Sequence, residues 1–138
     1  MLGHLYEQQD CSAARALELV GERWSLLILR DAMFAGSTRF GEFQKGLEIA
    51  PNILSKRLKD FVEAGIMESP AGGEYHLTRK GMELKTVIVA LTLWGDKWVR
   101  PGPIVYIADD CGGTVEAQLR CDAGGAELDV EDVKVRLR

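Results

Sequence analysis

The chain has 138 residues, of which 46% are hydrophobic and 28% are charged, a composition typical of a soluble globular protein with an apolar core. No apolar run approaches the roughly 18 residues that are needed to cross a bilayer, and residues 1–4 do not resemble the start of a signal peptide. Three cysteines (Cys11, Cys111 and Cys121) are too few for a secreted disulfide framework. These features predict a cytoplasmic protein with no membrane partner.

The charge of the chain is unevenly distributed. The net charge is −4, whereas contact with phosphates favours a basic protein. Residues 1–100 hold 13 basic and 13 acidic side chains, and residues 101–138 hold 4 basic and 8 acidic ones. The first hundred residues can therefore carry a local basic face.

Helical patterns dominate residues 1–100. Ser12 is a favourable N-cap for the first helix, Gly21 ends it, and Pro51 suits the first turn of another helix. Two short runs of strand-forming residues, 66–68 and 75–77, flank a turn at 69–73. The helices that we expect are, in chain order, 13–20, 24–34, 40–46, 51–64 and 78–99.

A break follows at residues 100–103, where two prolines surround a glycine and no helix can continue. We therefore expect two domains, 1–100 and 101–138. The second domain shows runs typical of strands at 104–107, 115–119, 126–128 and 133–137.

The expected helix at 51–64 has two different faces at 100° per residue. Its apolar residues Leu54, Leu58, Phe61 and Val62 fall in one sector that should face the core. The opposite side carries polar and basic residues that can reach base edges or phosphates, namely Asn52, Ser55, Lys56 and Lys59, with Arg57 on the flank.

Such a face is most often only a solvated surface. The short helix and tight turn before it favour a helix-turn-helix, whose second helix enters the major groove. A two-stranded wing directly after the helix strengthens this interpretation.

Several segments, taken in order, resemble the HxlR-type winged-helix regulators, relatives of the MarR group. They are Cys11, 21–30 (GERWSLLILR), 39–43 (RFGEF), 54–58 (LSKRL), 63–65 (EAG) and 74–81 (EYHLTRKG). The resemblance implies a homodimeric transcription factor, often a repressor, that binds an inverted repeat. It also implies a DNA-facing set of Arg39, Ser55, Lys56, Arg57 and Lys59.

The wing at 69–73 departs from this family because it is short and has no Lys or Arg. We expect a weaker contact from it, which Arg79 and Lys80 could partly replace.

The last helix carries an apolar stripe at helical spacing: Leu84, Val87, Ile88, Leu91, Trp94 and Trp98. This stripe could complete the monomer core or pack against a second copy. A small core has little surface to cover a helix of roughly 30 Å, and the family resemblance points to dimerisation through the terminal helices. We therefore favour a homodimer interface.

The cysteines leave two interpretations open. Cys11, beside a helix N-terminus, could be a redox sensor, as in some family members, or a small packing residue. The region around Cys111 and Cys121 resembles a zinc-ribbon appendage, but Ala108 and Gly124 stand where two of the four ligands would be. We expect a ribbon-like appendage without metal.

The sequence thus predicts an α+β winged helix-turn-helix protein with a long dimerisation helix and a small β-rich appendage. We expect a homodimeric regulator that recognises specific double-stranded DNA, with an unidentified small-molecule effector or a redox response. No phosphate loop or activated nucleophile is present, so we expect neither an enzyme nor a cofactor. The alternative is a winged-helix module for protein–protein contact that uses its acidic tail.

Overall fold

The structure is a computed structural model that describes residues 5–70 and 72–138. The prediction for residues 1–4 and the turn position Ala71 lie outside the described residues. The chain divides into two compact units, Met1–Ile88 and Val89–Arg138, and each is described here by itself. The division falls inside the last long helix, whereas the sequence placed it after residue 100.

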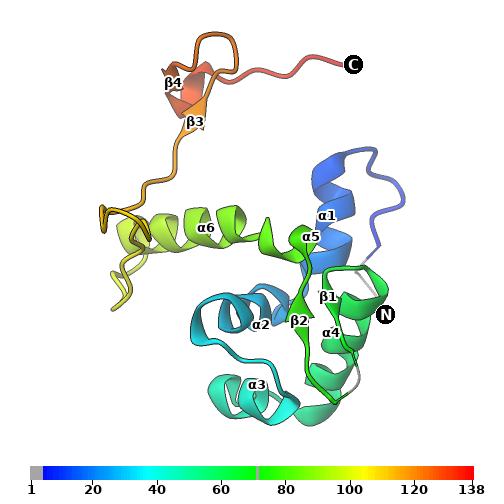
Figure 1. The fold of residues 1–138 in the computed structure, drawn as a ribbon. Helices are drawn as coiled ribbons and strands as arrows, with labels where there is room; N and C mark the ends of the chain where they lie inside the picture. Colours follow the sequence, from blue (N-terminus) through cyan, green and yellow to red (C-terminus); the bar gives the residue numbers. More distant parts are fainter. Residues whose placement is uncertain (1–4, 71) are drawn as a thin grey trace. The chain divides into compact units, whose positions relative to one another are not determined.

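The first unit contains helices and one small antiparallel sheet, so the predicted α+β winged-helix order is confirmed (Figure 1). The strands β1 and β2 pair Met67 with Leu77 and Glu68 with His76. The elements are α1 (Ser12–Val20), α2 (Ser25–Arg30), the π-helical turn η1 (Asp31–Ala35), α3 (Phe40–Leu47), α4 (Pro51–Glu63), β1 (Met67–Glu68), β2 (His76–Leu77) and α5 (Arg79–Met82).

Cys11, rather than the predicted Ser12, caps the first helix. Its backbone is extended and its sulfur accepts a hydrogen bond from the Ala14 amide at 3.4 Å. The thiol is exposed, so the interpretation of Cys11 as a buried packing residue is wrong.

The helix expected at 24–34 is two segments, α2 and η1. Ile28 and Leu29 are fully buried, as expected for a central helix. The π-helical turn ends at Gly36, whose φ of 73° is left-handed and suits glycine.

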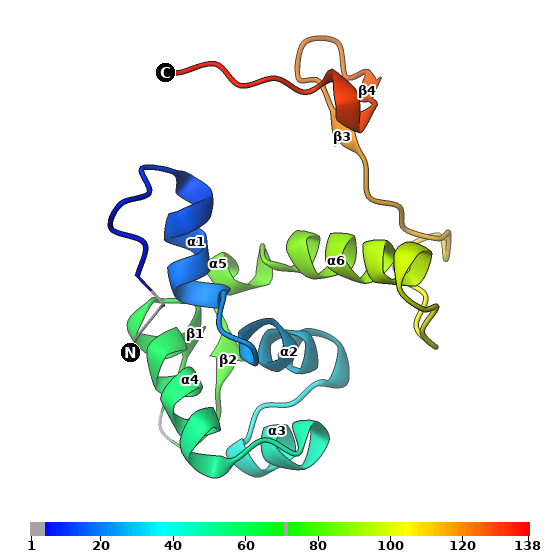
Figure 2. The same cartoon turned by 180° about the vertical axis from the view of Figure 1, so that it is seen from behind.

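The core lies where α2, α3, α4 and the start of β1 meet (Figures 1 and 2). From α4 it takes Leu54, Leu58 and Phe61, as predicted, and each contributes about 1.5–3 kcal/mol by leaving water. Val62, which we expected in the same sector, is exposed, because it lies at the edge of the helix's buried face. Burial along one side of α4 fixes which side chains the opposite side presents to solvent.

The predicted single helix at 78–99 is interrupted. Thr78 caps α5 by accepting from the Gly81 amide, and its hydroxyl donates to the Ile66 carbonyl at 3.1 Å. The chain then turns at Glu83 before α6 (Lys85–Trp98) begins. The hydrogen bonds from Thr78 to Ile66 tie the start of α5 to the segment between α4 and β1.

The second unit holds the end of α6 and a region with little regular secondary structure. That region contains a two-stranded hairpin, β3 (Leu119–Arg120) and β4 (Glu127–Leu128), followed by η2 (Val130–Asp132). The expected strands 115–119 and 126–128 are therefore found only in part. The runs at 104–107 and 133–137 are not strands: the first makes one isolated bridge, Ile107 to Thr114. The zinc-ribbon likeness is not confirmed.

Candidate nucleic-acid interface

Helices α3 and α4 form a helix-turn-helix with a three-residue connection. Glu48 adopts a left-handed backbone (φ 54°) that ends α3, and Pro51 opens α4. Glu42 fixes the start of α3, because its carboxylate accepts from the amides of Thr38 at 3.2 Å and Arg39 at 2.9 Å. These backbone hydrogen bonds hold the pKa of Glu42 below its usual range.

The outer side of α4 presents the polar set that the sequence predicted. Asn52, Ser55, Lys56 and Lys59 are all exposed. Lys56 pairs with Asp60 one turn later at 2.7 Å, which leaves Lys59 as the α4 lysine with no ion pair among the described residues. Amide, hydroxyl and ammonium groups on one helix face can contact both base edges and phosphates.

Arg57 differs from the expectation that it faces DNA. Its side chain is only 7% exposed and pairs with Asp60 at 3.2 Å and Glu22 at 3.9 Å. A guanidinium held in this way ties α4 to the segment before α2. The helical wheel placed Arg57 on a flank, and only the packing of that segment shows that this flank is covered.

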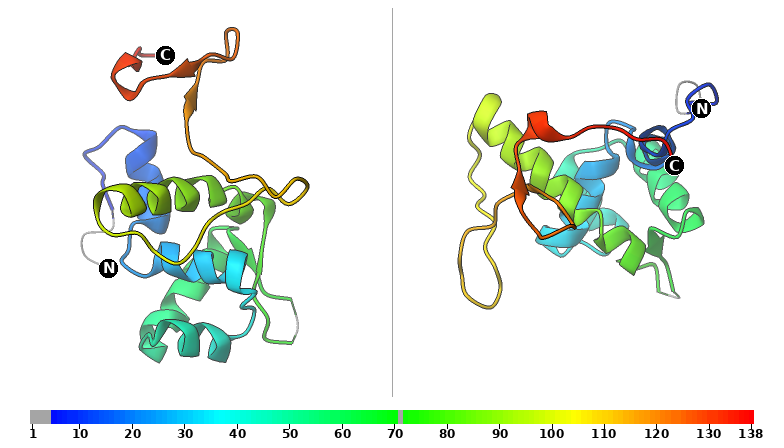
Figure 3. Two further views of the ribbon diagram at one scale, coloured as in Figure 1. Left: turned by 90° about the vertical axis from the view of Figure 1, so that its left-hand side faces the viewer. Right: turned by 90° about the horizontal axis from the view of Figure 1, so that it is seen from above.

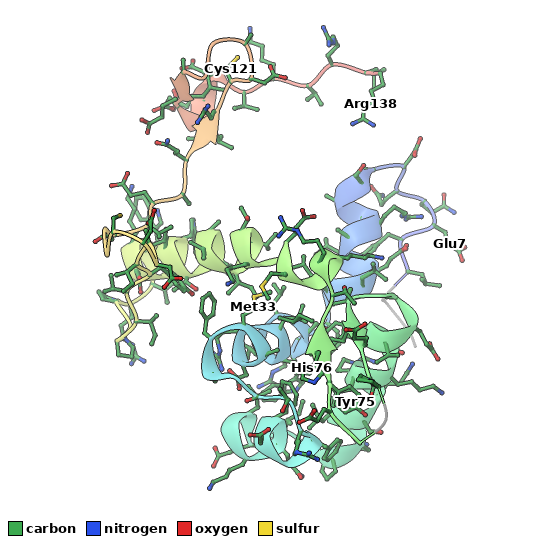
Figure 4. All side chains as sticks on the ribbon, in the orientation of Figure 1. Glu7, Met33, Tyr75, His76, Cys121 and Arg138 are labelled. Atoms are coloured by element: carbon green, nitrogen blue, oxygen red, sulfur yellow. The ribbon has the colours of Figure 1, made fainter. Side chains whose placement is uncertain are left out.

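Arg39 lies at the wing rather than beside the outer face of α4. It forms an antiparallel bridge with Glu74, donates to the Gly72 carbonyl at 3.2 Å and lies 3.5 Å from the Glu74 carboxylate. The Tyr75 amide also donates to the Thr38 carbonyl at 2.7 Å. Tyr75 and His76, which follow Glu74 in the chain, are labelled in Figure 4.

The wing therefore has a third extended segment around Arg39, which was not predicted from the sequence. The run at 37–39 is too short to show the alternation of a strand. The wing turn at 69–73 has no basic residue, and this segment places the guanidinium of Arg39 beside it.

Arg79 and Lys80 lie at the other end of α4. The Lys80 ammonium donates to the Ala64 carbonyl at 2.7 Å, just beyond the last residue of α4, and Arg79 pairs with Glu83 at 3.4 Å. Twelve residues of helix separate Asn52 from Ala64, or about 18 Å. The structure thus does not bring Arg79 and Lys80 to the N-terminal half of α4.

Among residues 5–70 and 72–138, no three His, Cys, Asp or Glu side chains gather as a metal site. No helix in the described part of the chain is both long enough and apolar enough to span a bilayer.

This geometry defines a class of protein, the winged helix-turn-helix DNA-binding proteins: a short helix, a tight turn, an exposed polar helix and an adjoining wing. The sequence model of the HxlR-like helix-turn-helix family matches residues 19–103. The chain belongs to this family, whose relatives are helix-turn-helix (HTH) transcriptional regulators, and it is a DNA-binding regulator of that kind.

Two relatives match almost the whole chain. The HTH-type transcriptional regulator Rv3095 of Mycobacterium tuberculosis is 41% identical, over 96% of this chain and 87% of its own length. The solved structure of the transcription-factor candidate PA1607 is also 41% identical, covers 94% of this chain and 96% of that chain, and has a TM-score of 0.80.

A third relative lacks much of this chain's length. The quinone-bound structure of YodB from Bacillus subtilis is 30% identical with a TM-score of 0.55, and it covers 64% of this chain but 99% of that chain. About a third of this chain therefore has no counterpart in YodB.

Proposed function

We propose that two copies of this chain bind an inverted repeat in double-stranded DNA and repress the adjoining gene. In this arrangement each α4 enters the major groove with its N-terminal half, and the two copies of α4 lie about one DNA turn apart, roughly 34 Å. The observation that carries the proposal is the exposed set Asn52, Ser55, Lys56 and Lys59 on a helix whose other face is locked into the core.

Arg39 completes the proposed contact surface from the wing. Its side chain is 59% exposed beside the wing turn, where its guanidinium can reach a phosphate or the minor groove. Arg57 is left out of the contact set because its guanidinium is buried.

Selection of bound duplexes from a random pool with the full chain tests this proposal. We expect an inverted repeat with half-sites about one turn apart, and K56E should weaken binding to every selected sequence. A single unrepeated site would refute the dimer, and the absence of any enriched duplex at low salt would refute specific recognition. In a reporter fused to the selected site, repression predicts that expression rises when the regulator is deleted.

The apolar stripe of α6 supports pairing. Ile88 is buried and Leu84 packs on the core of the first unit, so these two residues complete the monomer. Val87, Leu91, Trp94 and Trp98 remain exposed, the tryptophans at 58% and 66%. A stripe of large apolar side chains spaced at i, i+4, i+7 and i+11 is typical of a helix that packs on another helix.

An open hollow of about 450 Å³ in the second unit runs beside this stripe and includes Leu91, Trp94 and Val99. We propose that the partner's α6 packs along it. W94E combined with W98E should convert the dimer to a monomer in sedimentation, while T86E, an exposed change off the stripe, should leave it dimeric. Unchanged mass in the tryptophan variant would refute this interface.

We further propose that a small molecule or an oxidant controls DNA binding. A cavity of about 360 Å³ in the first unit is lined by Leu19, Ser25, Arg57 and Phe61 among others. Because Arg57 and Phe61 belong to α4, an occupant there can shift the helix that reads DNA.

The exposed Cys11 thiol supplies a second route to the same end. Diamide should release DNA from the wild type and from C111S with C121S, because it would oxidise the Cys11 thiols of the two copies to one intermolecular disulfide and be reduced to its hydrazine. C11S, whose serine keeps an N-cap oxygen, should stay bound. Equal release from C11S would exclude Cys11 as the sensor.

A further inference from the structure

The last six residues of the chain alternate strictly between apolar and basic side chains: Val133, Lys134, Val135, Arg136, Leu137 and Arg138. We call residues 133–138 the basic segment. In an extended chain such alternation places all apolar groups on one face and all cations on the other. Val133 is indeed extended, with φ −100° and ψ 125°.

The basic segment pairs with no strand among residues 5–70 and 72–138. It leaves the β3–β4 hairpin region as a single open trace that can be followed to Arg138 (Figures 3 and 4). The side chains of Val135 and Leu137 are 98% and 93% exposed. The region of the chain that directly precedes the segment therefore does not cover its apolar face.

Residues 101–132, which we call the acidic region, have the opposite character. They carry eight carboxylates and one basic side chain, Arg120, whereas the basic segment has three cations and no carboxylate. All eight carboxylates are exposed, and none forms an ion pair with a described residue. The acidic region also exposes apolar side chains, among them Ile104, Ile107 and Val130.

The β3–β4 hairpin has two paired residues on each strand. A lone two-stranded hairpin is marginally stable, and its unpaired edges are templates for a further strand. A third strand with aliphatic groups on one face and cations on the other would match both the exposed apolar groups and the carboxylates of this region.

We propose that the basic segment of one copy adds as a β-strand to the acidic region of a second copy, and that the two copies exchange segments reciprocally. Strand addition supplies main-chain hydrogen bonds, and opposite charges set the orientation. Reciprocal exchange of identical elements is a low-cost way to join two protomers in a closed dimer.

Duplex DNA is the rival partner for three cations. It would cover the basic face and leave three aliphatic side chains in water. Asp129, Glu131 and Asp132 directly precede the segment, and their charges repel a phosphate backbone that approaches it. The protein partner is therefore favoured.

Zero-length carbodiimide cross-linking tests the exchange in the full chain. Lys134 is the only lysine between residues 101 and 138, so its amide links to carboxylates of the acidic region can be assigned by mass spectrometry. The sample is a dimer assembled by subunit exchange from ¹⁵N-labelled and unlabelled copies. We expect links from Lys134 to the acidic region that join a labelled to an unlabelled peptide.

The control K134R keeps the charge but cannot form the amide, so it should lose the links and nothing else. V135D combined with L137D should abolish the mixed-isotope links. In hydrogen exchange, the wild-type amides of 133–138 should exchange about tenfold more slowly than those of this variant.

Same-isotope links alone would place the segment on its own acidic region and overturn the exchange. Protection of 133–138 that appears only after duplex DNA is added would assign the segment to DNA and also overturn it. The inference rests on the proposed homodimer but can fail separately from the proposed DNA binding. If neither the wild type nor V135D with L137D gives mixed-isotope links while both proteins retard duplex DNA, strand exchange is wrong and the regulator proposal stands.

Discussion

Lys59 and Arg57 are basic neighbours on α4 that should respond oppositely to substitution. Lys59 is exposed and without a described ion pair, so we predict that K59Q loses a phosphate contact in the proposed complex. Each neutralised phosphate contributes about 0.9 to the slope of log K against log salt, so two copies in a dimer lose about 1.8. If K59Q and the wild type bind equally at 1 M salt, the smaller slope makes K59Q bind roughly 60-fold more weakly than the wild type at 0.1 M.

For Arg57 the structure predicts a stability effect instead. R57Q removes pairs with Asp60 and Glu22, whose side chains are 31% and 26% exposed. Breaking a fully buried pair costs about 3–5 kcal/mol, and this partial exposure reduces the cost to about 1–2 kcal/mol. The melting temperature should fall by roughly 5–10 °C.

Fluorescence anisotropy of a labelled duplex over a salt series, together with thermal denaturation of each variant, measures both effects. K59Q should change the salt slope and leave the melting temperature within error; R57Q should do the reverse. A reduced slope in R57Q at unchanged melting temperature would show that its guanidinium reaches phosphate, and the assignment from burial would be refuted.

Three other substitutions test the scaffold. In G81A, a Cβ would meet the Ile66 carbonyl oxygen at 2.2 Å, so we expect about 1–3 kcal/mol of destabilisation in urea unfolding, against almost none in G41A, where a Cβ meets open space. F43A should cost about 3–5 kcal/mol because Phe43 is fully buried; a smaller loss would mean that the core collapses around the cavity. E42Q should be less stable than the wild type at pH 7. Because the pKa of Glu42 in the folded protein lies below 4.5, the difference in unfolding free energy between the two proteins should shrink as the pH falls below 4.5. A difference that does not change with pH would contradict this.

The sequence was informative where a periodic pattern is long. The helical spacing of apolar and polar residues along α4 predicted both its buried side, with Leu54 and Leu58, and its exposed side, with Ser55 and Lys59. Packing between segments that are distant in the chain was not predictable in this way. The cover over Arg57 comes from the region of Glu22, and nothing in the spacing of α4 indicates it.

The same limit explains the errors at the ends of elements. One helix was expected over 78–99, but α5 ends at Met82. Gly81 lies so close to the chain after α4 that a Cβ would meet the Ile66 carbonyl oxygen at 2.2 Å, which is a tertiary constraint. In the tail, residues 133–137 have the alternation of a strand, yet an alternating pattern becomes a strand only when a partner edge is available. The unpaired state of this segment is the reason why a second copy can be considered as its partner.

The wing and the start of α3 are linked through Arg39. Its amide binds the Glu42 carboxylate at the start of α3, while its guanidinium holds the Gly72 carbonyl and approaches Glu74 in the wing. A phosphate that captures this guanidinium must compete with Glu74 and Gly72, so DNA contact at the wing and the position of α3 are linked. R39K should therefore weaken DNA binding more than the loss of one ion pair explains, because a lysine cannot hold two partners in a fixed planar fork. If R39K binds duplex as tightly as the wild type, the wing contributes no contact through this residue, and recognition rests on α4 alone.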